Sequence, residues 1–209
     1  MNCKRLVCGL YESNAYLIFA KDGRSAFLID AGDDLAGLLS AIDASGARLQ
    51  AIVLTHGHFD HILAAKGIRE KTGAKVYIGA GDAPYLADQL LNCYDEQVSR
   101  AAFAPMEADE LIGVPGREGV ITLCGYDLRV LETPGHTPGG ICLYCEEEKA
   151  LFTGDTLFAR GYGRMDLPGG SERDMVRSLK KLLALEDDVT IYPGHGPLAT
   201  IGAARGGLF

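Results

Sequence analysis

Residues 55–61 read THGHFDH and place three of the chain's five histidines in a single turn. The other two are His136, in TPGHTPGG, and His195, in YPGHGP. Each lies among Gly and Pro after an apolar, strand-like run, and Asp155 in LFTGDTLF follows another such run. Because loops at the ends of neighbouring strands gather at one rim of an α/β sheet, we expect these side chains to converge there.

The spacing within residues 55–61 predicts two metal ions rather than one. His56 and His58 are two residues apart, so an extended segment lets both rings point the same way. Asp60 and His61 follow at the start of a predicted helix and point elsewhere. Four ligands so close in sequence cannot surround one ion, but they can serve two neighbouring ions. We expect two ligand sets that share a bridging Asp155, with His56, His58 and His136 in one and Asp60, His61 and His195 in the other.

The ligand types indicate which metals the site would bind. Imidazole and carboxylate without thiolate favour Zn²⁺, with iron or manganese as alternatives. A single histidine in a loop is usually only a hydrogen-bonding residue. Five of them beside carboxylates would be costly to desolvate if nothing bound them. The sequence therefore predicts a cofactor of two divalent metal ions, with Zn²⁺ as the first choice.

Length and composition predict one soluble domain spanning residues 1–209. The chain has 20 Lys and Arg against 28 Asp and Glu, a net charge of −8, so neither nucleic acid nor an anionic membrane is the expected partner. The N-terminal apolar stretch ends by Glu12, too early for a signal peptide, and no apolar run is long enough to cross a bilayer. We expect a cytoplasmic protein with a small-molecule substrate; its oligomeric state is left open.

The order of sequence patterns predicts an α/β fold with sheets inside and helices outside. Strand-like runs cover residues 4–11, 14–20, 25–32, 49–55 and 74–80 in the first half, and 120–125, 126–135, 140–145, 150–155 and 189–196 in the second. Helical spacing covers residues 34–45, 59–73, 83–98 and 172–185. Each half therefore begins with strands and continues with helices.

Two of the six cysteines, Cys142 and Cys145 in CLYC, have the spacing of a metal or redox motif. They lie on a predicted strand, where positions three apart face opposite sides. We therefore expect buried or half-buried apolar cysteines that cannot converge on one atom.

With these residues assembled, the sequence resembles the metallo-β-lactamase superfamily. THGHFDH matches the HxHxDH signature of that family, and His136, Asp155 and His195 follow in the expected order. The match spans most of the chain. The resemblance implies a four-layer αββα sandwich of two similar halves, with a dimetal site at one edge.

Within the superfamily, the chain is most similar to the short bacterial type of glyoxalase II-like hydrolase. The similarity rests on SNAYLI, IDAG, TPGHTPGG, GDTLF, GRMDLPGG and YPGHGP. Asp155 stands where true metallo-β-lactamases carry a cysteine, which argues against antibiotic hydrolysis. Full-length glyoxalase II has a helical C-terminal extension that binds glutathione, whereas this chain ends fourteen residues after His195, which puts glutathione as the thiol carrier in question.

The resemblance implies hydrolysis of a thioester such as an S-acyl-glutathione. A hydroxide that bridges the two ions and is oriented by Asp60 would attack the acyl carbon, and the thiolate would leave without a strong general acid. Two zinc ions outweigh two carboxylates and one hydroxide, so we expect a cationic pocket that favours an anionic substrate.

Three further residues have predicted roles beside the metals. Arg164, in GRMD, occupies the position of a basic residue that binds the substrate's terminal carboxylate in glyoxalase II; the alternative is a surface arginine paired with Asp166. Tyr162 could hydrogen-bond a substrate amide or simply pack in its loop. Asp30, in LIDAG, is expected to orient a metal-binding histidine, with an Asx-type turn as the alternative.

Two other functions share these residues. A persulfide dioxygenase would use one Fe(II), held by His56, His136 and Asp155, with O₂ and a glutathione persulfide; GRMDLPGG is closer to the hydrolase pattern. A non-catalytic metal-binding module would need only four ligands and leave no open position, whereas all seven predicted ligands are present.

Overall fold

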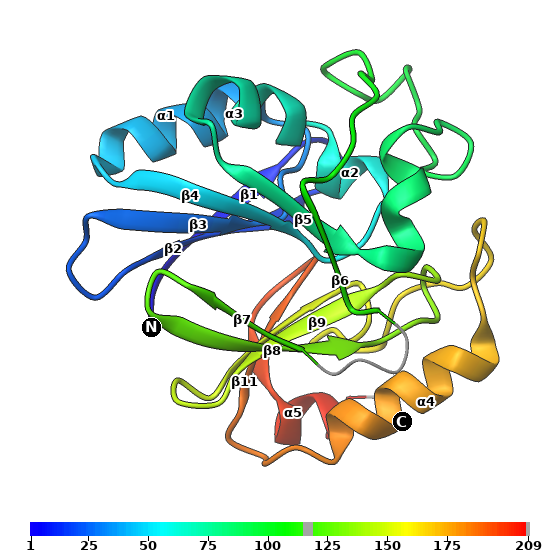
Figure 1. Cartoon of the computed structure of the whole chain (residues 1–209). Helices are drawn as coiled ribbons and strands as arrows, with labels where there is room; N and C mark the ends of the chain where they lie inside the picture. The colour runs from blue at the N-terminus through cyan, green and yellow to red at the C-terminus, as the bar shows by residue number, and fades with distance from the viewer. Residues whose placement is uncertain (115–118, 208–209) are drawn as a thin grey trace.

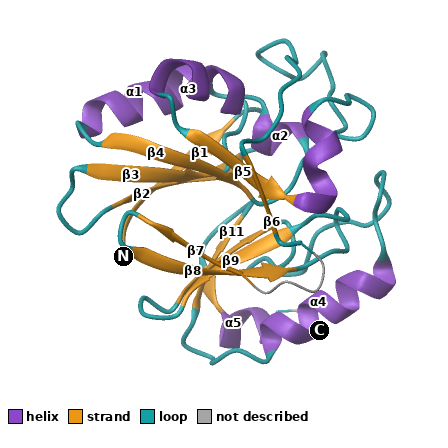
Figure 2. Ribbon diagram, in the orientation of Figure 1, coloured by secondary structure: helices purple, strands orange, loops and turns teal. Residues whose placement is uncertain are grey.

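The computed structural model describes residues 1–114 and 119–207. Two six-stranded sheets face each other, and helices cover the outer face of each sheet (Figure 1, Figure 2). The strand orders are β1-β2-β3-β4-β5-β6 and β12-β11-β10-β9-β8-β7. The predicted four-layer αββα sandwich of two similar halves is confirmed.

The first half forms one sheet and its helical cover. Its strands are β1 (Asn2–Cys8), β2 (Ser13–Phe19), β3 (Ser25–Ile29), β4 (Arg48–Leu54), β5 (Lys75–Gly79) and β6 (Glu110–Ile112). Strands β1 to β3 pair antiparallel, and β3 to β6 pair parallel. The helical segments are α1 (Leu35–Ser45), α2 (Phe59–Ile62), α3 (Ala65–Thr72) and the 3₁₀ helix η1 (Ala80–Leu86). Helix α1 begins after an aspartate cap, because the Asp34 carboxylate accepts the Gly37 N–H at 3.0 Å.

The second half repeats this plan. Its strands are β7 (Gly119–Leu123), β8 (Tyr126–Glu132), β9 (Ile141–Cys145), β10 (Ala150–Gly154), β11 (Thr190–Pro193) and β12 (Ala199–Thr200). Strands β7 to β10 pair antiparallel, and β10 and β11 pair parallel. The helices are α4 (Glu172–Leu183) and α5 (Ile201–Gly206). No helix in the described part of the chain is long and apolar enough to span a membrane.

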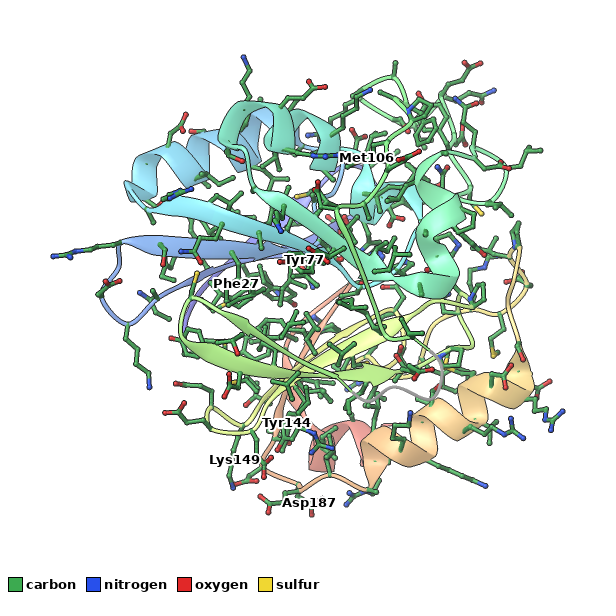
Figure 3. All side chains as sticks on the ribbon, viewed as in Figure 1. Phe27, Tyr77, Met106, Tyr144, Lys149 and Asp187 are labelled. Carbon is green, nitrogen blue, oxygen red and sulfur yellow. The ribbon has the colours of Figure 1, made fainter. Side chains whose placement is uncertain are left out.

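Side-chain alternation along the strands separates three apolar layers. In β3, Leu28 belongs to the core beneath α1 and α3, whereas its neighbour Phe27 belongs to the core between the sheets. Figure 3 shows Phe27 and Tyr77 in the space between the sheets and Tyr144 on the far side of the second sheet. Each fully buried Leu or Phe contributes about 1.5–3 kcal/mol to folding, so these layers stabilise both halves.

The same alternation decides the role of the CLYC motif. Cys142 lies in the core between the second sheet and its helices, whereas Cys145 lies in the core between the sheets. The two thiols face opposite sides of β9, and the prediction that they form no shared site is confirmed.

Residues 83–98 do not form the predicted helix. Only η1 occupies part of this range, and turns form most of the rest. Polar side chains compete for the backbone here: Asp88 Oδ1 accepts the Leu90 N–H at 2.8 Å, and Asp95 Oδ1 accepts the Gln97 N–H at 2.9 Å. Such local turns replace helical hydrogen bonds. The prediction was wrong because it weighed apolar spacing above these turn-forming residues.

The two halves are joined along the edge where β4, β8, β10 and β11 end. The Ile141 N–H donates to the Thr55 carbonyl at 2.9 Å, and the Asn14 N–H donates to the Gly194 carbonyl at 2.6 Å. These main-chain bonds cross from one half to the other. Backbone contacts therefore hold the loop after β4 against the start of β9 and the loop after β11 against β2.

Candidate metal centre

Three loops bring the five histidines together at this edge. His56, His58 and His61 follow β4, His136 follows β8, and His195 follows β11. His58 Nδ1 lies 2.8 Å from His136 Nε2. The His56 ring centroid lies 5.0 Å from that of His58 and 4.9 Å from that of His136. These three imidazoles make up the first predicted ligand set.

The second ligand set lies directly beside the first. His61 Nε2 is 3.1 Å from His195 Nε2. Asp60 Oδ2 is 3.4 Å from His61 Nε2 and 3.2 Å from His195 Nε2. Asp60 and His61 come from α2, and His195 comes from the other half of the chain. Neither half could therefore assemble this set alone.

Asp155, which follows β10, lies between the two sets. Its Oδ1 is 3.5 Å from His61 Nε2, and its Oδ2 is 3.6 Å from His136 Nε2 and 3.5 Å from His195 Nε2. The carboxylate reaches both sets, as a bridging ligand must. The structure thus brings all seven predicted ligands together, in overlapping groups whose candidate ligand atoms lie within 4.8 Å of one another.

Three buried atoms of this cluster have no hydrogen-bond partner among the described residues. They are His56 Nε2, His58 Nε2 and Asp155 Oδ1. Leaving one such atom unsatisfied costs about 1–3 kcal/mol. A divalent cation would satisfy His56 Nε2 and Asp155 Oδ1, while His58 faces the first ligand set through Nδ1, the nitrogen nearest His136 Nε2. Imidazole with carboxylate is a common ligand set for such an ion. The residues therefore fit bound divalent metal ions.

The cluster opens onto a cleft of about 230 Å³. Besides predicted ligands, the cleft is lined by Tyr11, Phe59, Cys93, Arg164 and Leu167. Of the residues predicted to bind substrate, Arg164 thus lines the cleft beside the cluster. The other four were not predicted from the sequence; they lie on the β1–β2 turn, α2 and two loops.

Tyr162, the other residue predicted to bind substrate, lies away from the cleft. Its side chain is 45% exposed and lines a separate hollow with Met175 and Leu179 of α4. The structure therefore does not bring Tyr162 to the metal cluster, and its position favours the alternative of packing beside its own loop.

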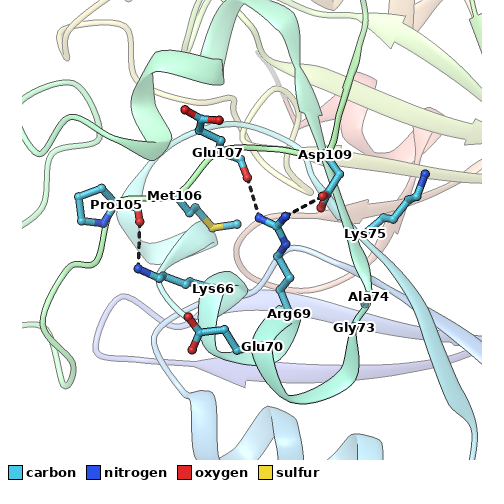
Figure 4. Close-up of a pocket in the computed structure, with 10 residues that line it drawn as sticks. All are labelled: Lys66, Arg69, Glu70, Gly73, Ala74, Lys75, Pro105, Met106, Glu107 and Asp109. Atoms are coloured by element: carbon cyan, nitrogen blue, oxygen red, sulfur yellow. Dashed lines mark hydrogen bonds and ion pairs between the residues drawn. The ribbon is translucent and has the colours of Figure 1, made fainter.

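A hollow of about 470 Å³ lies elsewhere, beside α3 (Figure 4). Its cations are engaged by the chain itself: Arg69 donates to the Glu107 carbonyl at 3.0 Å and to Asp109 Oδ1 at 2.7 Å. Lys66 donates to the Pro105 carbonyl at 3.1 Å. These contacts hold residues 105–109 against α3. Because its cations are already paired within the chain, we do not treat this hollow as a candidate ligand-binding site.

Comparison with known families agrees with this geometry. The sequence profile described as the Metallo-beta-lactamase superfamily matches residues 8–195. The chain belongs to the metallo-β-lactamase superfamily. The matched range includes all seven predicted ligands, and the cluster at the sheet edge contains groups that could hold metal ions.

Similar proteins carry several different names. Hydroxyacylglutathione hydrolase GloC of Haemophilus influenzae is 34% identical over 209 residues, which cover 98% of this chain and 95% of GloC. The crystal structure of the BLEG-1 B3 metallo-beta-lactamase has a TM-score of 0.88 at 33% identity, and the match covers 96% of this chain and 95% of the BLEG-1 chain. The crystal structure of TTHA1623 in a di-iron-bound form has a TM-score of 0.86 at 33% identity and covers 98% of both chains. Superfamily membership therefore indicates a metallo-hydrolase type of protein with divalent metals and does not by itself choose the substrate.

In this metallo-β-lactamase superfamily member, Asp30 contacts the second ligand set through the ring of His61. Its Oδ2 lies 2.9 Å from His61 Nδ1. Its carboxylate also accepts the Thr55 N–H at 2.7 Å and the Thr55 hydroxyl at 2.9 Å. A carboxylate in this position fixes the tautomer and orientation of the ring, so that Nε2 faces the ion. The contact is the one predicted for Asp30.

Main-chain carbonyls hold two more histidines. His136 Nδ1 lies 2.7 Å from the Arg164 carbonyl, and His195 Nδ1 lies 3.0 Å from the Tyr11 carbonyl. Both rings therefore donate through Nδ1 and present Nε2 to the cluster. Because these partners are backbone atoms, the amino-acid sequence carries no direct signal for them.

Asp82 is a buried residue with no role predicted from the sequence. It is 0% exposed and accepts the Gly57 N–H at 2.8 Å, the Thr137 hydroxyl at 2.6 Å and the Gly139 N–H at 2.6 Å. One carboxylate thus ties the loop after β4 to the loop after β8. A signal was present, because Asp82 follows an apolar strand among glycines, as Asp155 does.

Burial and neighbouring charges set the protonation of the cluster. Burial, helped by neighbouring imidazoles, lowers the pKa of His58 to about 3 and that of His56 well below 6.5, so both rings are neutral as metal ligands must be. Burial raises the pKa of Asp60, but His61 and the hydrogen bond from His195 lower it more, so Asp60 stays ionised. Burial lowers the pKa of His61, but nearby carboxylates raise it to about 10, so an ion that binds there replaces a proton.

Replacing Asp30 with asparagine tests its support of the cluster. We expect Asp30→Asn to weaken Zn²⁺ binding by about 10- to 100-fold, because an amide cannot polarise His61 as a carboxylate does. Competition with a chromogenic chelator measures the affinity. The control is Asp43→Asn, which removes the same charge from an exposed position on α1. Equal affinity in both variants would show that Asp30 has no such role.

Substitution of Gly194 tests whether the cluster has room for one additional methyl group. A Cβ at this position would collide with Asp155 Oδ1 and lie 2.8 Å from His61 Cε1. We expect Gly194→Ala to displace Asp155 and to reduce the number of ions bound per chain, as measured by mass spectrometry of the intact protein under native conditions. Gly206→Ala, whose Cβ meets nothing within 4 Å, is the matched control and should bind as the parent does. Full metal binding by Gly194→Ala would contradict the geometry.

Proposed function

We propose that the protein is a dimetal thioesterase that hydrolyses S-acyl-glutathione-type thioesters. The observation that carries this proposal is the composition of the cleft. Five of the seven predicted ligands line it, and its remaining lining residues, Tyr11, Phe59, Cys93, Arg164 and Leu167, include neither a carboxylic acid nor a histidine. The relative named hydroxyacylglutathione hydrolase GloC supports the same substrate class.

Each of the two ligand sets would bind one metal ion. His56, His58 and His136 would hold one ion, Asp60, His61 and His195 the other, and Asp155 would contribute to both. Bound divalent ions would lower the pKa of water towards neutrality and polarise the acyl carbonyl. The relative with a di-iron-bound form makes iron an alternative to Zn²⁺.

Asp60 is suited to orienting the attacking water rather than to accepting its proton. Its pKa is held below the ordinary aspartate range by His61 and His195, despite the opposing effect of burial. A carboxylate that stays ionised remains a hydrogen-bond acceptor throughout the neutral range. Asp60 therefore fixes the direction of attack while it serves as a ligand.

Among the described residues that line the cleft, the lack of a carboxylic acid or histidine outside the two ligand sets favours a thiolate leaving group. An amine must gain a proton to depart, whereas a thiolate, with a conjugate-acid pKa of about 8.5, leaves unaided. Cys93 does not offer an alternative nucleophile, because burial raises the pKa of its thiol and keeps it protonated at neutral pH. The cleft thus suits water-dependent cleavage of a thioester.

The test is hydrolysis of S-D-lactoylglutathione by the metal-loaded protein, compared with the matched amide in which NH replaces sulfur. We expect the thioester to be cleaved and the amide to resist. Chelation should abolish the activity, Zn²⁺ or iron should restore it, and His136→Ala should reduce it to background. The exposed-residue variant Asp43→Asn is the control and should retain activity.

Two outcomes would contradict the thioesterase. Because one similar structure is named a B3 metallo-beta-lactamase, a β-lactam belongs in the same assay, and faster cleavage of the β-lactam than of the thioester would overturn the proposal. Oxygen uptake with glutathione persulfide, one Fe per chain and no hydrolysis would indicate the dioxygenase instead.

A further inference from the structure

One cation lines the metal cleft among the described residues. This cation is Arg164, and the apolar or aromatic side chains of Tyr11, Phe59 and Leu167 line the cleft with it. A substrate that carries a carboxylate therefore has one guanidinium to pair with at this site.

That guanidinium is already engaged by a carboxylate of the chain. Arg164 Nε donates to Asp166 Oδ1 at 2.6 Å, and Nη2 donates to Asp166 Oδ2 at 2.7 Å. This pairing occupies one of the two edges through which a guanidinium can bind a carboxylate with two bonds. Arg164 holds the pKa of Asp166 at about 2, so the competing charge is present at every working pH.

We propose that Asp166 is a specificity-determining residue that competes with the substrate's carboxylate for Arg164. The inference rests on the proposed thioesterase and adds a selectivity device to it. An incoming carboxylate either replaces Asp166 or takes the remaining edge of the guanidinium beside a like charge, and both routes weaken binding. Asp166 therefore moderates the preference of the cleft for anionic substrates.

Asp166 competes for the arginine rather than positioning it. The backbone of Arg164 is held independently, because its carbonyl accepts a hydrogen bond from His136 at 2.7 Å. Gly163 lies so close to the cluster that a Cβ there would sit 3.1 Å from His136 Cγ. The side-chain pair, by contrast, is exposed, at 64% for Arg164 and 66% for Asp166, and exposed ion pairs are weak enough for a ligand to displace.

The experiment measures selectivity with two substrates that differ in one group. One is a thioester whose thiol part ends in a free carboxylate, and the other carries a primary amide at that position. The readout is the ratio of kcat/KM for the carboxylate to kcat/KM for the amide. We expect Asp166→Asn to raise this ratio about two- to fivefold, through a lower KM for the carboxylate substrate.

Three further variants serve as controls. Asp188→Asn removes the same charge from an exposed pair with Lys149, at the end of β11 opposite His195, and should leave the ratio unchanged. Arg164→Gln should lower the ratio, and adding Asp166→Asn to it should change nothing further. An unchanged or lower ratio in Asp166→Asn alone would overturn the competition.

Binding measurements separate this inference from the proposed function. Thioether analogues of the two substrates cannot be hydrolysed, and calorimetry gives their dissociation constants directly. If no thioester is cleaved but Asp166→Asn tightens binding of the carboxylate analogue relative to the amide, the thioesterase fails and the competition stands. If the relative affinity is unchanged or falls, or if the carboxylate analogue binds neither protein, the competition fails.

Discussion

The burial of so many imidazole and carboxylate groups at one sheet edge is the constraint on which the structure depends. His56, His58 and His61 are almost fully buried, and the cluster leaves ring nitrogens and a carboxylate oxygen without partners among the described residues. Such atoms oppose folding unless a cation satisfies them. Metal binding and folding of this edge are therefore coupled, because the groups that would bind the ions are the groups that oppose folding without them.

This constraint explains why the fold needs two similar halves. Each predicted ligand set takes residues from the loop after β4 in one half and a histidine from the other half, His136 or His195. Asp82 joins the loops of the first set, and the main-chain bond from Asn14 to Gly194 joins the loop that carries His195 to β2 of the first half. The packing of the two halves against each other thus determines the spacing of the predicted ligands.

The sequence predicted what depends on residue type and local spacing. The seven ligands were found because imidazoles and carboxylates concentrate at strand ends, and the opposed faces of Cys142 and Cys145 follow from strand geometry. It could not predict contacts that use backbone atoms, such as the Arg164 carbonyl beside His136. Residues 83–98 failed as a helix because Asp and Asn side chains bind their own backbone there, which apolar spacing does not register.

The most direct test of the shared cluster is the metal content of the purified protein. The chain is saturated with Zn²⁺, desalted and analysed by inductively coupled plasma mass spectrometry, together with His195→Ala. We predict about two ions per chain in the parent and about one in the variant, because His195 belongs to one ligand set and the other set does not use it. A single ion in the parent, or equal content in both proteins, would contradict two ligand sets that share one edge.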